Sequence, residues 1–162
     1  KKIKIISIEP NPINCRRLKE NIMLLKNKIT NINKLVTIKS CAVGNNNEKK
    51  VLNFSHGLAN GYISDNRKDK QSIFIHSRKL YDIVNEEKLT HITNLKIDIE
   101  GYEDKALIPF FKKAKRSLFP TNILIEHSGK QFWDNDLIKF LFKLGYKKVF
   151  KNKSNLALTL QK

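Results

Sequence analysis

The stretch LKIDIEGYED, residues 95–104, decides how the rest of this 162-residue sequence is interpreted. Its apolar residues alternate with Asp98 and Glu100, and Gly101 ends the alternation. Asp and Glu are poor strand formers, and an alternation of period two places both carboxylates on one side of a strand. We therefore predict a strand over residues 94–100 whose end is either simply solvated or a place where something binds.

Apolar runs and amphipathic helices alternate on both sides of this segment. Buried strands are predicted where β-branched and apolar residues run almost continuously, at 2–8, 36–43 and 122–126. Three helices are predicted from their apolar spacing, one with Asn11 as N-cap and Pro12 at its first position, one after Gly101, and one over 134–146. The helix after Asn11 has an apolar stripe from Cys15 to Ile29. Pro109 should kink or restart the helix after Gly101, and Gly145 should cap the helix over 134–146.

The middle and the end of the chain are less regular. Short strands are predicted at 51–54 and 72–76, a loop at 56–71, and a strand end followed by a short helix at 77–88. Residues 146–150 and 156–160 flank the turn KNKSN and predict a terminal hairpin. The pattern indicates a single α/β domain over residues 1–162, built around a mostly parallel sheet with one antiparallel strand near its edge.

Composition limits the possible partners and compartment. No apolar run is long enough to span a bilayer. The formal net charge of +17 could indicate nucleic acid, but the lysines are scattered and only five of the 32 basic residues are Arg, the better phosphate reader, so this partner is disfavoured. The two cysteines, Cys15 and Cys41, form no C-x-x-C pair and are expected to be buried reduced thiols of a cytoplasmic protein.

Acids stand at the ends of three predicted strands. Glu9 ends the first, Asp98 and Glu100 end the opening one, and Glu126 ends the next, directly before His127. Because ligands of open α/β sheets bind at the carboxyl ends of strands, we expect Glu9, Asp98 and Glu100 to line one rim within reach of a small ligand.

Each of these residues also has a simpler interpretation. A carboxylate can accept hydrogen bonds from both hydroxyls of a ribose diol, which suits Glu9 to that role. Glu9 is equally suited to the N-terminus of the helix that follows. Glu100 could cap the helix after Gly101, and a lone His127 is more often structural than catalytic. Asp98, Glu100, Glu126 and His127 could together bind a hard metal ion, although we expect no metal. Gly101 suits a positive φ or a close backbone approach.

The blocks SIEPNPINCRRLKENI, CAVGNNN, RKLYDIV, LKIDIEGYEDKAL and ILIE resemble, in this order, the motifs of FkbM-type methyltransferases. These are class I, S-adenosylmethionine-dependent O-methyltransferases with a Rossmann-like sheet. The resemblance runs from about residue 3 to 127. KIDIEG at 96–101 is its most specific part, and EPN at 9–11 supports it. Where the family has L-D-D, this chain has Leu80-Tyr81-Asp82, so one acid is absent.

The resemblance implies roles for the strand-end residues. Glu9 would hold the cofactor ribose, Cys41 and Ala42 would lie by the adenine, and Asp98 would lie near the amino-acid end or the sulfonium of the cofactor. Glu100 would orient or deprotonate an acceptor hydroxyl, as a carboxylate with a raised pKa can do. Glu126 and His127 would line the acceptor side. The acceptor implied is a small molecule or glycan: a sugar, glycolipid or secondary metabolite.

The family's first strand and Gly-rich turn, which cradle the methionine part of the cofactor, have no counterpart after Lys1. We therefore expect an N-terminally incomplete class I sheet, and a chain that binds S-adenosylmethionine weakly or not at all by itself. The alternative is a basic, non-catalytic remnant or a nucleic-acid-binding module, which salt-dependent affinity for RNA or DNA would reveal.

Overall fold

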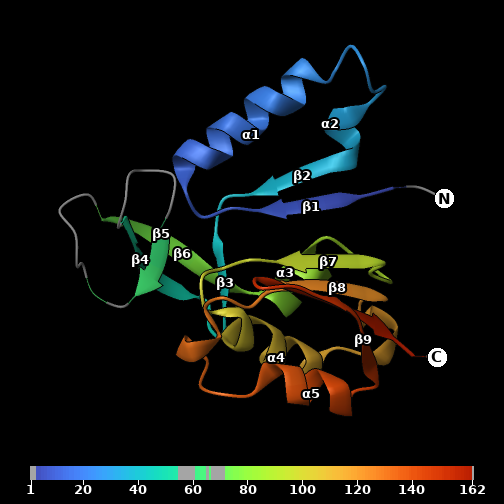
Figure 1. Ribbon diagram of the computed structural model, residues 1–162. Helices are drawn as coiled ribbons and strands as arrows, with labels where there is room; N and C mark the ends of the chain where they lie inside the picture. Colours follow the sequence, from blue (N-terminus) through green and yellow to red (C-terminus); the bar gives the residue numbers. More distant parts are fainter. Residues whose placement is uncertain (1–2, 55–60, 65, 67–71, 162) are drawn as a thin grey trace. The chain divides into compact units, whose positions relative to one another are not determined.

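The computed structural model describes residues 3–54, 61–64, 66 and 72–161 (Figure 1). It has a mixed α/β fold whose described strands form three sheets. The chain divides into two compact units, one of Lys1–Val43 with Glu48–Ser77, the other of Gly44–Asn47 with Arg78–Lys162. Whether residues 1–162 act as one domain stays a prediction.

The first unit begins with a parallel strand pair and its connecting helices. β1 (Ile5–Ile8) pairs in parallel with β2 (Val36–Lys39), and α1 (Pro12–Leu24) and α2 (Ile32–Leu35) connect them. Figure 1 shows α1 running along this pair. The predicted start of α1 is confirmed, because the Asn11 side chain accepts from the Ile13 N–H at 2.9 Å and Pro12 opens the helix. This helical connection is long enough to return the chain to the same end of the pair, so β1 and β2 can be parallel.

The same unit contains a mostly antiparallel sheet in the order β3-β6-β4-β5. Its strands are β3 (Ala42–Gly44), β4 (Glu48–Phe54), β5 (Gly61–Ser64) and β6 (Ile73–Lys79). β4 runs antiparallel to both β5 and β6. Its core contains Ala42, Leu52, Phe54 and Ile75, which are all buried.

The second unit is one sheet with helices on one face. Its strands are β7 (Asn94–Ile97), β8 (Asn122–Glu126), β9 (Tyr146–Lys151) and β10 (Asn155–Leu160), in the order β7-β8-β10-β9. Its helical segments are α3 (Leu80–Glu86), α4 (Glu103–Lys113), η1 (Arg116–Leu118), η2 (Lys130–Phe132) and α5 (Leu137–Lys143). β7 and β8 are parallel, whereas β10 is antiparallel to β8 and β9, which confirms the predicted terminal hairpin.

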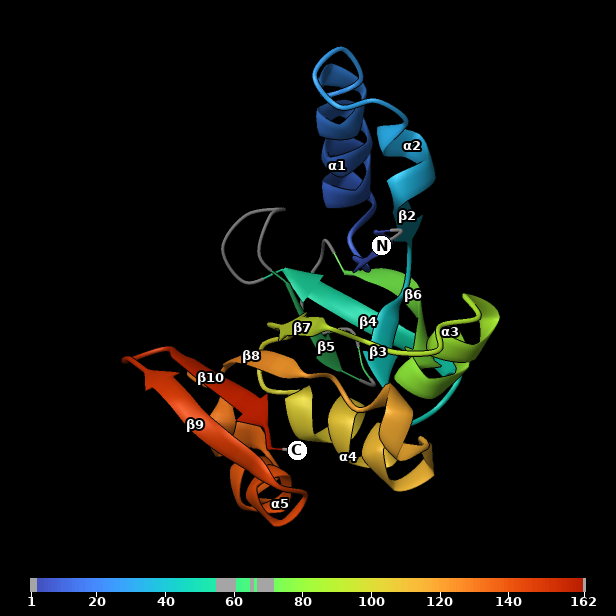
Figure 2. The ribbon, with the colours of Figure 1, turned by 90° about the vertical axis from the view of Figure 1, so that its right-hand side faces the viewer.

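The core of this unit lies between the sheet and its helices, α4 and α5 (Figure 2). The register places Ile123 opposite Leu158 and Ile125 opposite Leu156, so these four side chains share one face. All four are at most 2% exposed, as are Phe110 of α4 and Leu137 and Leu141 of α5. The buried strand predicted at 122–126 is present, but its burial alternates along the strand, with Ile123 and Ile125 facing the helices.

Two predicted strands are less buried than expected. β7 lies at the edge of its sheet, exposes Asn94 and Lys96, and ends at Ile97 instead of residue 100. β1 starts at Ile5, which is 50% exposed. The strand predicted over 94–100 is therefore shorter than expected and lies at an exposed edge, and the buried strand predicted over 2–8 is wrong in burial and in length. Among the described strands, β1 pairs only with β2 and β7 only with β8, so each has one edge without a ladder partner.

Several element boundaries also differ from the prediction. The run 36–43 is two strands, because the chain leaves β2 after Lys39 and Ala42 enters another sheet. α1 ends at Leu24, so the predicted stripe stops short of Ile29, which is 42% exposed. Much of the predicted loop at 56–71 lies outside the described residues, but residues 61–64 form β5, which pairs with β4.

The helix after Gly101 continues through Pro109, and α4 does not restart there. Proline removes one helical hydrogen bond. The neighbouring Leu107, Phe110 and Phe111 are at most 4% exposed, so their burial outweighs the missing bond and the predicted restart is wrong. The last helix begins only at Leu137, with Asp136 as N-cap, and Gly145 follows it with φ of 94° as expected of a C-terminal glycine.

Candidate functional site

The acids at the ends of β7 and β8 come together within the second unit. Asp98 and Glu100 follow β7, Glu126 ends β8, and the two strands are parallel, so their carboxyl ends meet at one edge. The pKa of Glu100 is raised above its ordinary value, first by partial burial of the carboxylate and then by repulsion from Asp98, Glu126 and Glu103. Lys96 partly offsets this charge through a 3.3 Å ion pair with Asp98.

The turn that carries Glu100 has an unusual backbone. Glu100 has φ of 55° and Gly101 has φ of 94°, so two successive residues adopt left-handed conformations. A glutamate in this region is strained. Among the described residues, the Glu100 side chain has no hydrogen bond that would explain the strain as local capping. The interpretation of Glu100 as a helix cap is therefore not supported by the geometry.

Gly101 meets both of the requirements expected of it. Besides its positive φ, it lies against Gly129 in the turn after β8. A Cβ on Gly129 would lie 2.7 Å from the Gly101 nitrogen, and a Cβ on Gly101 would lie 3.0 Å from the Gly129 oxygen. Contacts this short are not tolerated without a backbone shift, so the two turns approach so closely only because both positions are glycine.

A buried carboxylate, Glu103, holds this turn in place. It is 0% exposed, and its Oε1 accepts from the N–H of Ile99 at 2.9 Å and of Gly101 at 3.3 Å. Its Oε2 accepts from the indole N–H of Trp133 at 2.8 Å. One side chain thus ties the Glu100 turn to a segment 30 residues away.

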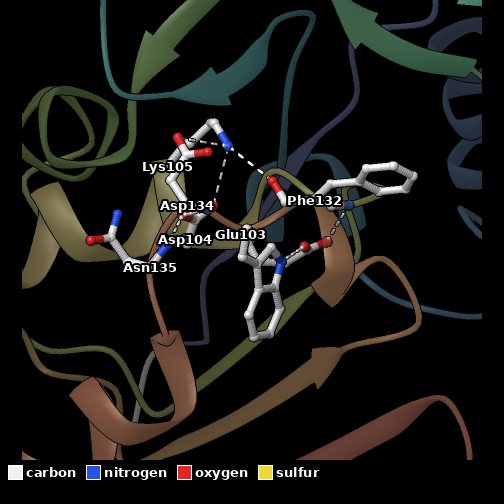
Figure 3. A network of polar contacts seen from close by, with 8 residues as sticks. Glu103, Asp104, Lys105, Phe132, Asp134 and Asn135 are labelled. Atoms are coloured by element: carbon white, nitrogen blue, oxygen red, sulfur yellow. Dashed lines mark hydrogen bonds and ion pairs between the residues drawn. The ribbon is translucent and has the colours of Figure 1, made fainter.

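The neighbouring Asp104 fixes the same segment from a second point. Its Oδ2 accepts from the N–H of Asp134 at 2.9 Å and of Asn135 at 3.1 Å. Lys105 lies 3.3 Å from the Asp134 carboxylate and donates to the Phe132 carbonyl at 3.3 Å. Figure 3 shows these side chains converging from α4 on the 132–135 segment. The first turn of α4 therefore holds both the Glu100 turn and the 133–135 segment.

Glu126 and His127 lie at the end of β8 as predicted. Glu126 Oε1 accepts from the Ser128 N–H at 3.2 Å, and His127 is 6% exposed with its backbone N–H bonded to the Ser154 carbonyl at 2.7 Å. Within the described part of the chain, Glu126 Oε2 and His127 Nε2 are buried without a hydrogen-bond partner. Buried polar atoms normally have one, so both atoms have capacity for a ligand group or water.

The cofactor residues predicted from the sequence belong to the first unit. Glu9 is half-buried, and its Oε1 accepts from the Asn11 N–H at 2.8 Å, as an acid beside a helix start does. Cys41 and Ala42 are 5% and 2% exposed, and Ala42 belongs to the core of the β3-β6-β4-β5 sheet. Both cysteines are buried and form no disulfide, as expected. The clustering of Glu9 with Asp98 and Glu100 stays a prediction, because they lie in different units.

In the parts of the chain that the structure describes, no group of three His, Cys, Asp or Glu side chains could hold a metal ion. Nor does any helix there have the length and hydrophobicity to cross a bilayer.

Sequence analysis missed Glu103, Gly129 and Trp133 as parts of this site. Glu103 was visible as an acid in the first helical turn after Gly101, where an acid commonly meets free backbone N–H groups. The contribution of Gly129 and Trp133 has no local signal, because it arises from packing between distant segments.

In this mixed α/β fold, carboxylates gather at the ends of parallel strands, which is where ligands of open α/β sheets bind. The sequence matches the family described as "Methyltransferase FkbM domain" over residues 1–148. The chain therefore belongs to the FkbM methyltransferase family, as the strand-end motifs indicated.

A solved structure agrees with this assignment at the level of the fold. The methyltransferase FkbM from Methylobacillus flagellatus KT superposes with a TM-score of 0.64 at 19% sequence identity. The match covers 96% of this chain and 36% of that one, so this chain spans about a third of the length of its structural neighbour. No curated protein matches the sequence significantly.

Proposed function

We propose that this chain forms part of an S-adenosylmethionine-dependent O-methyltransferase in which Glu100 receives the proton of the acceptor hydroxyl. The observation that carries the proposal is the strained Glu100 turn, where a carboxylate with a raised pKa follows a parallel strand. Strain of this kind concentrates at functional sites, and a raised pKa makes a carboxylate a better base.

The residues present fit the cofactor that the family uses. One oxygen of Glu9 accepts from the Asn11 N–H, and the other has no partner among the described residues, so it can accept a ribose hydroxyl. Cys41 and Ala42, which we propose lie by the adenine ring, are 5% and 2% exposed, so only a small part of either can contact it. Asp98 offers a carboxylate for a positively charged group. When bound, S-adenosylmethionine supplies an activated methyl group on a sulfonium.

On the acceptor side, the chain's own residues position and deprotonate a hydroxyl. Glu100 accepts the hydroxyl proton as the oxygen becomes a nucleophile. The partial burial that chiefly raises its pKa, and the repulsion from Asp98 and Glu126 that adds to it, favour this protonated product. Glu126 Oε2 and His127 Nε2, which lack partners among the described residues, can bind neighbouring hydroxyls. We propose a sugar, glycolipid or secondary metabolite as the acceptor, and the cytoplasm as the compartment.

The proposal is tested in the longest natural protein that contains these residues. Glu9→Ala should weaken S-adenosylmethionine binding measured by calorimetry. Glu100→Gln should leave that binding intact and lower turnover about 10²- to 10⁴-fold, the usual contribution of a general base. An unchanged turnover in Glu100→Gln would reduce Glu100 to a structural residue of the turn.

A further inference from the structure

An open cavity of about 500 Å³ lies over the segment between η2 and α5. Its apolar lining comes from Trp133, Ile138 and Phe142, and its cations are Lys130 and Lys139. The volume is within the range of sites that take small organic ligands, and the combination of aromatic walls with a few polar groups is typical of them.

The charges of this cavity are not equally available to a ligand. Of its two acids, Asp134 forms an ion pair with Lys105 at 3.3 Å, and Asp136 Oδ1 accepts from the Lys139 N–H as the N-cap of α5. Within the described ranges, the ammonium groups of Lys130 and Lys139 have no ion-pair or hydrogen-bond partner. Asp134 and Asp136 keep their negative charge, but the groups without a partner among the described residues are the two ammonium groups, and in a chain of formal net charge +17 these can bind an anionic group such as phosphate or carboxylate.

The aromatic wall is fixed to the proposed catalytic turn. Trp133 lines the cavity while its indole N–H donates to Glu103, whose other oxygen holds the backbone of Ile99 and Gly101. Phe142, which also lines the cavity, is 46% exposed, so much of its apolar surface has no covering side chain. A flat ring is the ligand shape that can contact such aromatic side chains over the largest area.

We propose that this cavity binds a ring-bearing anion, with the ring against Trp133 and Phe142 and the anionic group between Lys130 and Lys139. Trp133 bonds to Glu103, which also holds the Glu100 turn, so we assign the cavity to a part of the methyl acceptor away from its reacting hydroxyl. That assignment rests on the proposed function, whereas binding itself depends only on the geometry of the second unit.

Trp133 is the sole tryptophan of the chain, so its fluorescence reports directly on the cavity. The 162-residue chain is titrated with phenyl phosphate, inorganic phosphate and the neutral phenyl glucoside. We expect a saturable change with phenyl phosphate, at a dissociation constant at least about tenfold below that of either other probe, because only phenyl phosphate offers both ring and charge.

Variants separate the site from the general charge of the chain. The double substitution Lys130→Gln and Lys139→Gln should weaken phenyl phosphate binding at least about tenfold. Lys147→Gln, which removes an exposed charge from β9 outside the cavity, should leave it unchanged. Equal affinity for the neutral probe, an equal loss in Lys147→Gln, or no saturable change would overturn the proposal. None of these results depends on cofactor binding, so the proposed methyl transfer stands or falls separately.

Discussion

The contact between Glu103 and Trp133 predicts a measurable coupling between two distant segments. In Glu103→Gln, the single amide oxygen can still accept from the Ile99 N–H. The amide NH₂ then takes the place of Oε2 and faces the indole N–H of Trp133. Two donors cannot satisfy each other, and Glu103 is fully buried. The unpaired indole N–H costs about 1–3 kcal/mol. That is a large part of a typical domain stability of about 5–15 kcal/mol.

A double-mutant cycle isolates this contact. Urea unfolding is followed by far-ultraviolet circular dichroism for Glu103→Gln, Trp133→Phe and the double variant. Because Trp133→Phe removes the unpaired donor, we expect the double variant to recover about 1–2 kcal/mol relative to the sum of the single changes. Additive effects within about 0.3–0.5 kcal/mol would show that the two side chains are not coupled, and would refute the link between cavity and turn. Glu86→Gln, at an exposed pair with Arg78, is the control and should cost at most about 1 kcal/mol.

Three further predictions follow from the same unit. Gly129→Ala should destabilise the fold by about 1–3 kcal/mol in urea unfolding, because its Cβ would lie 2.7 Å from the Gly101 nitrogen; a neutral effect would contradict the close packing of the two turns. Tyr146→Phe removes a 2.7 Å hydrogen bond to the Pro120 carbonyl and should cost about 1 kcal/mol at pH 7. Burial raises the pKa of Tyr146 in the folded chain, so the stability that its neutral hydroxyl contributes is complete below the unfolded pKa of about 10 and is lost as pH rises beyond it. The Tyr146→Phe variant should therefore lose less stability in alkali than the parent protein. Equal losses would be the contrary result. Glu100→Gln should stabilise the fold at neutral pH, because a raised pKa means that ionisation of Glu100 favours unfolding, and the gain should vanish below the ordinary value near 4.5; a stability gain that persists at pH 3 would have another cause.

The sequence by itself determined the local chemistry of this protein. Asn11 and Pro12 start a helix because their side chains satisfy or remove free N–H groups, and these signals act within one turn of the chain. Gly101 was predicted to need positive φ or a close approach for the same local reason. The order of the strand-end motifs likewise identified the family, which the family match over residues 1–148 confirmed.

Only the tertiary structure decided which strands meet and which side chains complete the site. The edge position of β7, the separate sheet of β3 and the strand at 61–64 depend on pairings between distant segments, which no local window of sequence contains. Burial of the residues around Pro109 likewise carried α4 through a residue that disfavours helix. The Glu103–Trp133 contact joins residues 30 positions apart, so its existence follows from packing and not from either residue alone.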